Sequence, residues 1–246
     1  MHFGEALPPL DVDIDLIRRL DRNGPRYTSY PTADRFVGTF TSADYRAWSK
    51  KRSRINPLSI YVHLPFCNTI CYYCACNKVI TKDKEKAAEY LRYLFREIEM
   101  QGEIFGKDSP VEQLHWGGGT PTFLSDEQMI SLMEKIGSHF RLVENGEYSI
   151  EIDPRKVNEV TIATLAKTGF NRISLGVQDF DRQVQLAVNR IQSEEETLRV
   201  LNAARAEGFK SVSIDLIYGL PKQSVNGFLK TLEKVIDAGP DRISIY

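Results

Sequence analysis

Apolar residues follow two alternating patterns from residue 59 onward. Short β-branched runs predict strands, and longer segments with apolar residues three and four positions apart predict amphipathic helices. Strands that alternate with helices are typical of βα units around a parallel sheet, so we predict an α/β fold. The six predicted strands are Ser59–His63, Gln113–Trp116, Tyr148–Ile152, Arg172–Val177, Ser211–Ile217 and Arg242–Tyr246.

The intervening helices carry their own start and stop signals. The segment Glu85–Gly102 has an apolar stripe at helical spacing, which indicates packing on a sheet. Two sequences read as capping boxes that open helices, Ser125-x-x-Gln128 and Ser193-x-x-Glu196.

Three glycines recur at the same place in the βα repeat. Gly169, Gly208 and Gly239 each end a predicted helix and are each followed within three residues by a predicted strand. Glycine adopts the left-handed backbone that closes a helix. In folds built from such units, chemistry takes place at the carboxyl ends of the strands.

Length and charge narrow the class of protein. The chain has 246 residues, 42% of them hydrophobic, which is enough for one sizeable core. The formal net charge is −1, from 32 basic and 33 acidic residues, so we expect no nucleic-acid partner. Met1–Asp15 has no basic region leading into an apolar one, and no apolar run approaches the roughly 20 residues that span a bilayer. We therefore expect a cytoplasmic protein without a membrane span.

All four cysteines of the chain lie within ten residues, at Cys67, Cys71, Cys74 and Cys76. Disulfides within so short a loop are hard to close, and structural zinc usually takes two separated cysteine pairs. Three thiolates at C-x3-C-x2-C spacing can instead bind three irons of a cubane cluster, leaving the fourth iron without a protein ligand. The cluster is the favoured interpretation, and a structural zinc module without chemistry is the alternative from another class.

The cysteine motif, with the aromatic Tyr73 before its third cysteine, resembles that of the radical S-adenosylmethionine (SAM) enzymes. The resemblance implies that Cys67, Cys71 and Cys74 hold a [4Fe-4S] cluster whose fourth iron is chelated by SAM. It also implies an open, partial (β/α)6 barrel, related to the eight-unit TIM barrel. Cys76 is left over.

Two further segments narrow the resemblance. The fourth cysteine, the preceding segment Tyr61–Phe66 and the N-terminal segment Pro25–Ala33 resemble the oxygen-independent coproporphyrinogen III oxidases. That family implies conversion of coproporphyrinogen III to protoporphyrinogen IX in anaerobic haem biosynthesis, with two bound SAM molecules. It further implies an electron donor such as flavodoxin or ferredoxin, and we expect a monomer.

The family is nearly twice as long as this chain, so we expect an N-terminal fragment that stops at or just after the sixth strand. We predict a substrate-side N-terminal extension over residues 1–55 and the partial barrel over residues 56–246.

The family also implies roles for residues at the strand ends. Gly118 and Glu151 are expected at the cluster-bound SAM, with Glu151 accepting the ribose hydroxyls. Gly119 and Thr120 are expected beside the second SAM. A tight glycine turn and a solvated strand end are the alternatives for these positions.

The remaining SAM contacts rest on the resemblance as well. Gln178, Arg190 and Asp215 are expected to hold the second SAM, and Tyr61 and Tyr73 are expected to contact cofactor. Taken singly, each of the first three is more often an end-cap or a surface charge, and Tyr61 is more often a core aromatic.

His63 and Cys76 are the candidate catalytic residues. A histidine at a strand end more often satisfies local hydrogen bonds, and a fourth cluster thiolate at Cys76 would close the site that SAM needs. Substrate carboxylates suit arginine forks and a flat macrocycle suits aromatic rings. The candidate substrate residues are Arg22, Arg26, Arg35 and Tyr27, with a solvated arm as the alternative.

Two rivals share the scaffold. A haem chaperone of the same fold is expected to lack Cys76 and the segment Pro25–Ala33. A radical SAM methyltransferase that binds two SAM molecules is the second rival, with a different substrate.

Overall fold

The computed structural model describes residues 13–22, 30–51 and 56–246. The chain divides into two compact units, Met1–Tyr45 and Arg46–Tyr246, and each is described by itself. The predicted domain boundary after residue 55 stays a prediction. Within the described residues, no helix is long and apolar enough to cross a membrane.

The unit Arg46–Tyr246 is built on a six-stranded sheet in which every neighbouring pair is parallel. The spatial order of the strands is their order along the chain. Because β1 and β8 are the two edges, the sheet is open over the described residues, as a partial barrel requires. The strands are β1 (Leu58–Leu64), β4 (Pro110–Gly118), β5 (Arg141–Ile152), β6 (Arg172–Gln178), β7 (Ser211–Leu216) and β8 (Arg242–Ile245).

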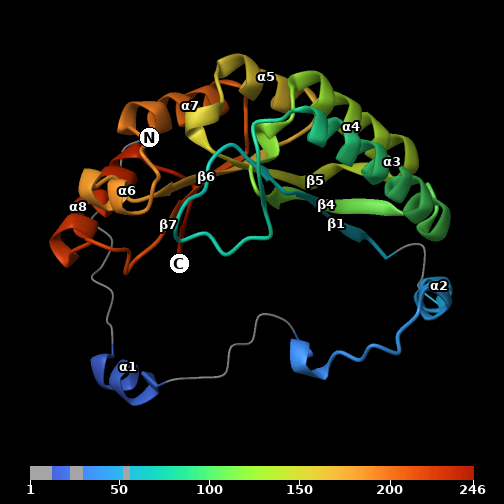
Figure 1. The fold of residues 1–246 in the computed structure, drawn as a ribbon, viewed down its shortest axis with the longest axis horizontal. Helices are drawn as coiled ribbons and strands as arrows, with labels where there is room; N and C mark the ends of the chain where they lie inside the picture. The colour runs from blue at the N-terminus through green and yellow to red at the C-terminus, as the bar shows by residue number, and fades with distance from the viewer. Residues whose placement is uncertain (1–12, 23–29, 52–55) are drawn as a thin grey trace. The chain divides into compact units, whose positions relative to one another are not determined.

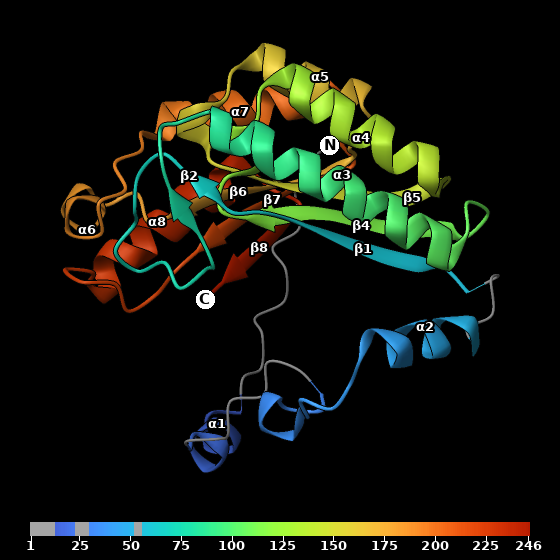
Figure 2. The ribbon, with the colours of Figure 1, turned by 45° about the vertical axis from the view of Figure 1, so that its right-hand side comes forward.

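Helices cover one face of this sheet. Figures 1 and 2 show α3, α4, α5 and α7 side by side over the strands, with α8 beside the last strands. Two short 3₁₀ helices, η2 (Pro121–Phe123) and η3 (Pro154–Lys156), follow β4 and β5. The α-helices of this unit are α3 (Glu85–Phe105), α4 (Asp126–His139), α5 (Glu159–Lys167), α6 (Arg182–Ala187), α7 (Glu194–Ala206) and α8 (Val225–Ala238).

The predicted helix start and stop signals are confirmed except at the end of α3, which continues to Phe105 rather than ending at Gly102. Ser125 and Ser193 form complete capping boxes at the starts of α4 and α7. Gly169, Gly208 and Gly239 all have positive φ, at 101°, 80° and 61°. Each chain reversal therefore uses a backbone conformation that glycine adopts without strain.

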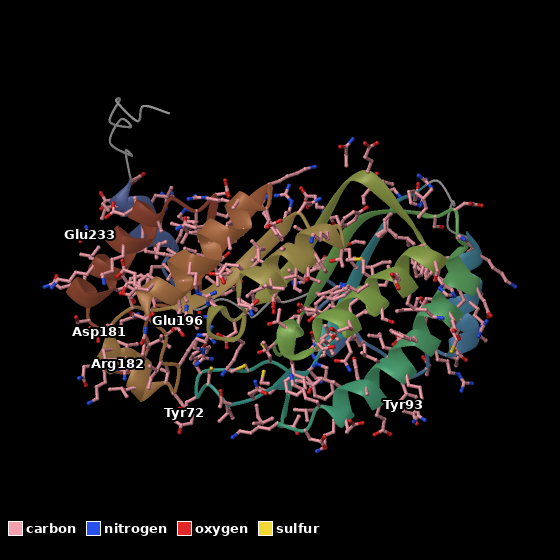
Figure 3. The ribbon with its side chains drawn as sticks, turned by 90° about the horizontal axis from the view of Figure 1, so that it is seen from above. Tyr72, Tyr93, Asp181, Arg182, Glu196 and Glu233 are labelled. Atoms are coloured by element: carbon pink, nitrogen blue, oxygen red, sulfur yellow. The ribbon has the colours of Figure 1, made fainter. Side chains whose placement is uncertain are left out.

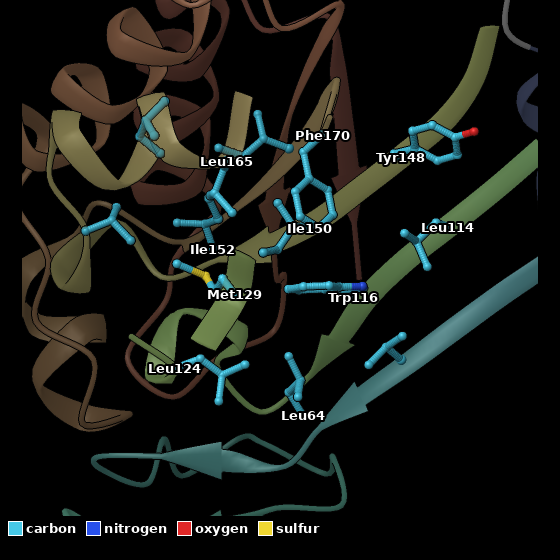
Figure 4. Packing of buried hydrophobic residues seen from close by; sticks show 14 of the residues in the cluster. Leu64, Leu114, Trp116, Leu124, Met129, Tyr148, Ile150, Ile152, Leu165 and Phe170 are labelled. Atoms are coloured by element: carbon cyan, nitrogen blue, oxygen red, sulfur yellow. The ribbon is translucent and has the colours of Figure 1, made fainter. Parts of the chain in front are cut away.

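The core lies between the sheet and the helices. Trp116 on β4 is fully buried, and its ring meets Phe170 edge to face at a centroid distance of 4.9 Å. Met129 of α4 and Ile150 of β5 pack in the same layer (Figure 4). Burial of each such side chain contributes about 1.5–3 kcal/mol, so this layer fixes how the helices sit on the strands.

The opposite face of the sheet is polar. Along β5 to β7, buried apolar residues alternate with partly exposed polar ones such as Ser149, Ser174 and Asp215. Successive strand residues point to opposite faces, so one face packs on the helices and the other carries polar side chains. This alternation brings chemistry-bearing groups to one side of the sheet.

A second, very small sheet was not predicted. β2 (Phe66–Cys67) and β3 (Val79–Ile80) pair in parallel. The backbone N–H of Val79 donates to the Pro65 carbonyl at 2.7 Å, and that of Thr81 donates to the Cys67 carbonyl at 2.9 Å. The segment Cys67–Val79, which we call the cysteine loop, is therefore closed at its base by backbone hydrogen bonds.

The unit Met1–Tyr45 contains α1 (Ile14–Leu20), capped by the Asp13 side chain, and η1 (Ala33–Arg35). Helix α2 (Ser42–Lys51) runs from this unit into the next along the chain. No residue of α1 is buried.

Candidate functional site

A cavity lies where the carboxyl ends of four strands meet the cysteine loop. Gly118 ends β4, Glu151 lies one residue before the end of β5, Gln178 ends β6 and Asp215 lies one residue before the end of β7. The carboxyl ends of parallel strands meet at one edge, which is why residues far apart in sequence converge there. The predicted residues that line the cavity are Cys67, Cys71, Tyr73, Cys74, Cys76, Gly118, Gly119, Thr120, Glu151, Gln178, Arg190 and Asp215.

All four cysteines are free thiols. The Cys67 sulfur lies 3.5 Å from the Thr120 hydroxyl, and burial raises the pKa of Cys67. Burial also raises the pKa of Cys76, which is the most exposed of the four. Within the described part of the chain, no three His, Cys, Asp or Glu side chains form a site for a single metal ion.

The cysteine loop is tied to the segment that follows α6. The backbone N–H of Tyr72 donates to the Val188 carbonyl at 3.0 Å, and the Asn189 side-chain amide donates to the Ile70 carbonyl at 2.7 Å. Asn189 has a φ of 56°, a left-handed conformation that asparagine tolerates. Figure 3 shows Tyr72 pointing outward from this loop. These contacts hold the loop beside Arg190.

The glycine turn after β4 permits close backbone approach. Gly118 has a φ of 112°, and a Cβ there would lie 2.6 Å from the His63 ring. A Cβ on Gly119 would lie 2.7 Å from the carbonyl of Pro65. Only glycine fits at these two positions without a shift of their neighbours.

Glu151 is oriented by two donors. Its Oε2 accepts a hydrogen bond from the Gly118 backbone N–H at 3.2 Å, and its Oε1 lies 3.3 Å from Nε2 of His115. The other ring nitrogen of His115 lies 2.7 Å from the Ser149 hydroxyl. The carboxylate is thus fixed at the cavity wall, while the role of His115 was not predicted.

Arg190 is one of the most buried charged residues of the described chain. Its guanidinium donates to the Gly176 carbonyl at 2.5 Å, lies 3.5 Å from Asp153 and reaches the Cys71 sulfur at 3.8 Å. Asp153 also accepts two hydrogen bonds from the side chain of Arg155, at 2.8 and 2.6 Å. Sequence reasoning missed both Asp153 and Arg155, although charged residues flanking a proline after a strand were a usable signal.

The neighbouring charges of Asp153, Arg155 and Arg190 shift one another's pKa values. Burial alone raises the pKa of Asp153, but Arg155 and Arg190 outweigh burial and lower it. Burial by itself lowers the pKa of Arg190, yet Asp153 raises it above its ordinary value. Burial raises the pKa of Asp215 despite the Ser174 hydroxyl 2.7 Å away.

Two predicted residues lie beside the cavity without lining it. Nδ1 of His63 lies 3.0 Å from the Tyr61 hydroxyl, and its Nε2 lies 2.9 Å from the Asn77 carbonyl. Both ring nitrogens therefore have local partners. Tyr61 also stacks on His115 at a centroid distance of 5.8 Å. Their predicted cofactor and catalytic roles stay predictions.

The candidate substrate residues belong to the unit Met1–Tyr45. Arg22 and Arg35 are exposed, and Arg35 pairs with Asp34 at 3.6 Å. Arg26 and Tyr27 lie outside the described residues. Their interaction with substrate stays a prediction.

The family model of the radical SAM superfamily matches residues 61–235, which include the cysteine loop, strands β4 to β7 and the residues that line the cavity. The chain belongs to the radical SAM superfamily. This membership implies a [4Fe-4S] cluster and SAM as cofactors.

Closer relatives of this radical SAM chain carry one name. It is 52% identical to the oxygen-independent coproporphyrinogen III oxidase of Pseudomonas aeruginosa and 47% identical to that of Salmonella typhimurium. These matches cover 95% and 96% of this chain, but 52% and 51% of the relatives. The chain thus spans about half the length of the curated relatives it matches.

A solved structure is similar over the same extent. Coproporphyrinogen III oxidase from Escherichia coli, described as a radical SAM enzyme, superposes with a TM-score of 0.87 at 45% identity. The match covers 96% of this chain and 52% of that one. The fold predicted from the βα pattern is confirmed.

Proposed function

We propose that this protein takes part in the oxidative decarboxylation of coproporphyrinogen III to protoporphyrinogen IX. In this reaction two propionate side chains become vinyl groups. For each one, the radical released by cleavage of one SAM would take a hydrogen atom from the β-carbon, the carboxylate would leave as carbon dioxide, and one electron would pass to an acceptor. The observation that carries the proposal is the convergence of Cys67, Cys71 and Cys74 with Glu151 on one cavity. The names of the relatives support the choice of substrate.

The residues present fit a cluster. The free thiols of Cys67, Cys71 and Cys74 line the cavity, and the Arg190 guanidinium donates toward the Cys71 sulfur at 3.8 Å. We call Cys67, Cys71 and Cys74 the ligand cysteines. When bound, the cluster supplies one electron for the reductive cleavage of SAM. Cys76 then remains free at the cavity wall.

The protein's own groups orient the cofactor. Glu151, held by Gly118 and His115, presents a fixed carboxylate that accepts ribose hydroxyls in charge-assisted hydrogen bonds. Gly118 lets the backbone approach the first SAM without a Cβ in the way. The proposed site of a second SAM is formed by Gly119, Thr120, Gln178, Arg190 and Asp215.

Several parts of the proposal concern partners. A low-potential one-electron donor, such as a flavodoxin or ferredoxin, is required to reduce the cluster. A cytoplasmic setting suits the free thiols, because thiols stay reduced there. We propose that the protein acts as a monomer.

The test is an anaerobic turnover assay. The purified protein is reconstituted with iron and sulfide, reduced with dithionite, and supplied with SAM and coproporphyrinogen III. Loss of two carbon dioxides per porphyrin by mass, with formation of 5′-deoxyadenosine, is the expected result. SAM cleavage without decarboxylation would refute it and favour a haem chaperone or a methyltransferase.

Two variants sharpen the assay. Glu151→Gln removes the charge that strengthens ribose hydrogen bonds, so the KM for SAM is expected to rise about tenfold, in line with 1.4 kcal/mol for one charge-assisted bond. Glu147→Gln is a matched control, because it makes the same change on the same strand β5 at a residue that pairs with Arg172 (Nη2–Oε1 2.5 Å) and does not line the cavity. An unchanged KM in Glu151→Gln would remove Glu151 from the SAM site.

A further inference from the structure

The buried Arg190 and the largely buried Arg155 share one carboxylate at the wall of the cavity. The Asp153 side chain is 9% exposed, as is that of Arg190, while that of Arg155 is 14% exposed. Asp153 accepts a bidentate pair of hydrogen bonds from the Arg155 guanidinium, and its Oδ1 lies 3.5 Å from Nη2 of Arg190. A single carboxylate neutralises only one of the two guanidinium charges.

Arg190 is held firmly but is not fully satisfied. Its Nη2 donates to the Gly176 carbonyl, and its Nη1 points to the Cys71 sulfur at 3.8 Å. Its Nε is buried and has no hydrogen-bond partner in the described part of the chain. Buried donors are normally paired, so this one indicates a group that binds beside it.

The side chains that line the cavity also include more positive than negative groups. Its carboxylates are Glu151, Asp153 and Asp215. Its cationic side chains are Lys78, Arg155, Lys156 and Arg190. Four positive groups face three negative ones before any thiol ionises, so the cavity carries one excess positive charge. An anionic ligand offsets such an excess.

We infer that Asp153 and Arg155 are positioning residues, which hold Arg190 at the Cys71 sulfur so that excess positive charge favours the reduced state of a cluster bound there. This inference rests on the proposed function, because it assumes a cluster on the ligand cysteines. Reduction adds one electron, supplied by the low-potential donor, and therefore one negative charge. Charges and hydrogen bonds at the sulfurs are among the factors that set cluster potentials.

Opposite charge changes provide the test. Arg155→Gln removes one positive charge from the network, and Asp153→Asn removes one negative charge while keeping an oxygen that accepts hydrogen bonds. In the reconstituted protein, we expect Arg155→Gln to lower the cluster midpoint potential and Asp153→Asn to raise it. A tenfold change in the reduction equilibrium, about 59 mV for one electron, is the expected size. EPR-monitored redox titration measures both.

The controls separate charge from packing. Arg172→Gln changes the same charge in the pair with Glu147, outside the cavity lining, and is expected to leave the potential unchanged. Arg155→Lys keeps the charge and is expected to restore the potential. If Arg155→Gln loses the cluster, Asp153→Asn carries the test: a higher midpoint potential than that of the unsubstituted protein supports the inference, and an unchanged or lower one overturns it.

Other outcomes overturn it. Loss of the cluster in both Arg155 variants would assign the residue a purely geometric role. Unchanged potentials, or shifts of the same sign in Arg155→Gln and Asp153→Asn, would contradict the charge argument. Failure of the unsubstituted protein to assemble any cluster would instead refute the proposed function.

Discussion

Replacement of Gly119 by alanine tests whether the cysteine loop depends on the close approach of the Gly119 backbone to the backbone of Pro65 and Phe66. The new Cβ would lie 2.7 Å from the carbonyl carbon and oxygen of Pro65 and 2.8 Å from the Phe66 oxygen. These are main-chain atoms, which cannot rotate away as a side chain does. Gly119 also donates its N–H to the Leu64 carbonyl at 2.9 Å, so a shift of the turn weakens this bond.

The expected loss follows from overpacking. Forcing one methyl group into a filled site costs about 1–3 kcal/mol, which for a chain of this size lowers Tm by about 2–12 °C. Gly137→Ala is the matched control, because Gly137 lies in α4 with nothing within 4 Å of an added Cβ. Alanine is the better helix former by about 1 kcal/mol, so this variant is expected to gain stability.

Thermal unfolding of the apoprotein, followed by circular dichroism, compares the two variants. Iron content after reconstitution adds a second readout, because the added Cβ would contact the backbone of Phe66 in β2, the strand that also contains Cys67. A Gly119→Ala protein as stable as the unsubstituted one would refute the reasoning. A loss of stability in Gly137→Ala equal to that in Gly119→Ala would show that the contacts of Gly119 are not the cause.

Two further predictions concern the cavity. Alanine at any one of the ligand cysteines is expected to abolish [4Fe-4S] assembly, whereas Cys76→Ala is expected to keep the full iron count. Iron analysis and EPR measure both effects. A three-iron species in Cys76→Ala would contradict the assignment of the three ligand cysteines. Asp215→Asn is expected to stabilise the protein at pH 7. Because burial raises the folded pKa of Asp215, its favourable contribution exists below the unfolded pKa of about 3.9 and is lost as pH rises through the folded pKa. Urea unfolding should therefore show a gain that shrinks as pH falls through the folded pKa and is absent below about pH 3.9, and a gain independent of pH would refute this origin.

The six main strands were predicted because their apolar runs are bounded by clear turn signals. Where the prediction fell short, pairing with a neighbouring strand decided the boundary. β5 begins at Arg141 rather than Tyr148, although residues 141–147 contain an Asn-Gly pair typical of a turn. Arg141 pairs with Pro110 of β4, and a register shift follows before Gln113. Periodicity along one segment carries no information about such a partner.

The small sheet of β2 and β3 illustrates the same limit. Each strand has two residues, which is too short for any alternation to be read. Only the return of the chain to Pro65 and Cys67 creates the hydrogen bonds that close the cysteine loop.

The sequence by itself indicated the chemistry through three cysteines at cluster spacing, a glycine turn and carboxylates near the carboxyl ends of strands. These features could be predicted because motif spacing and strand ends are local properties. The tertiary structure decided how these groups are held. His115 meets Glu151 across 36 residues of sequence, and Arg190 meets Cys71 across 119. Burial of Asp153 between two arginines depends on elements that meet only after the sheet has formed, and burial sets the strength of charge interactions. The sequence therefore predicts which residues form the site, whereas the fold decides which charged groups lie close to one another in it.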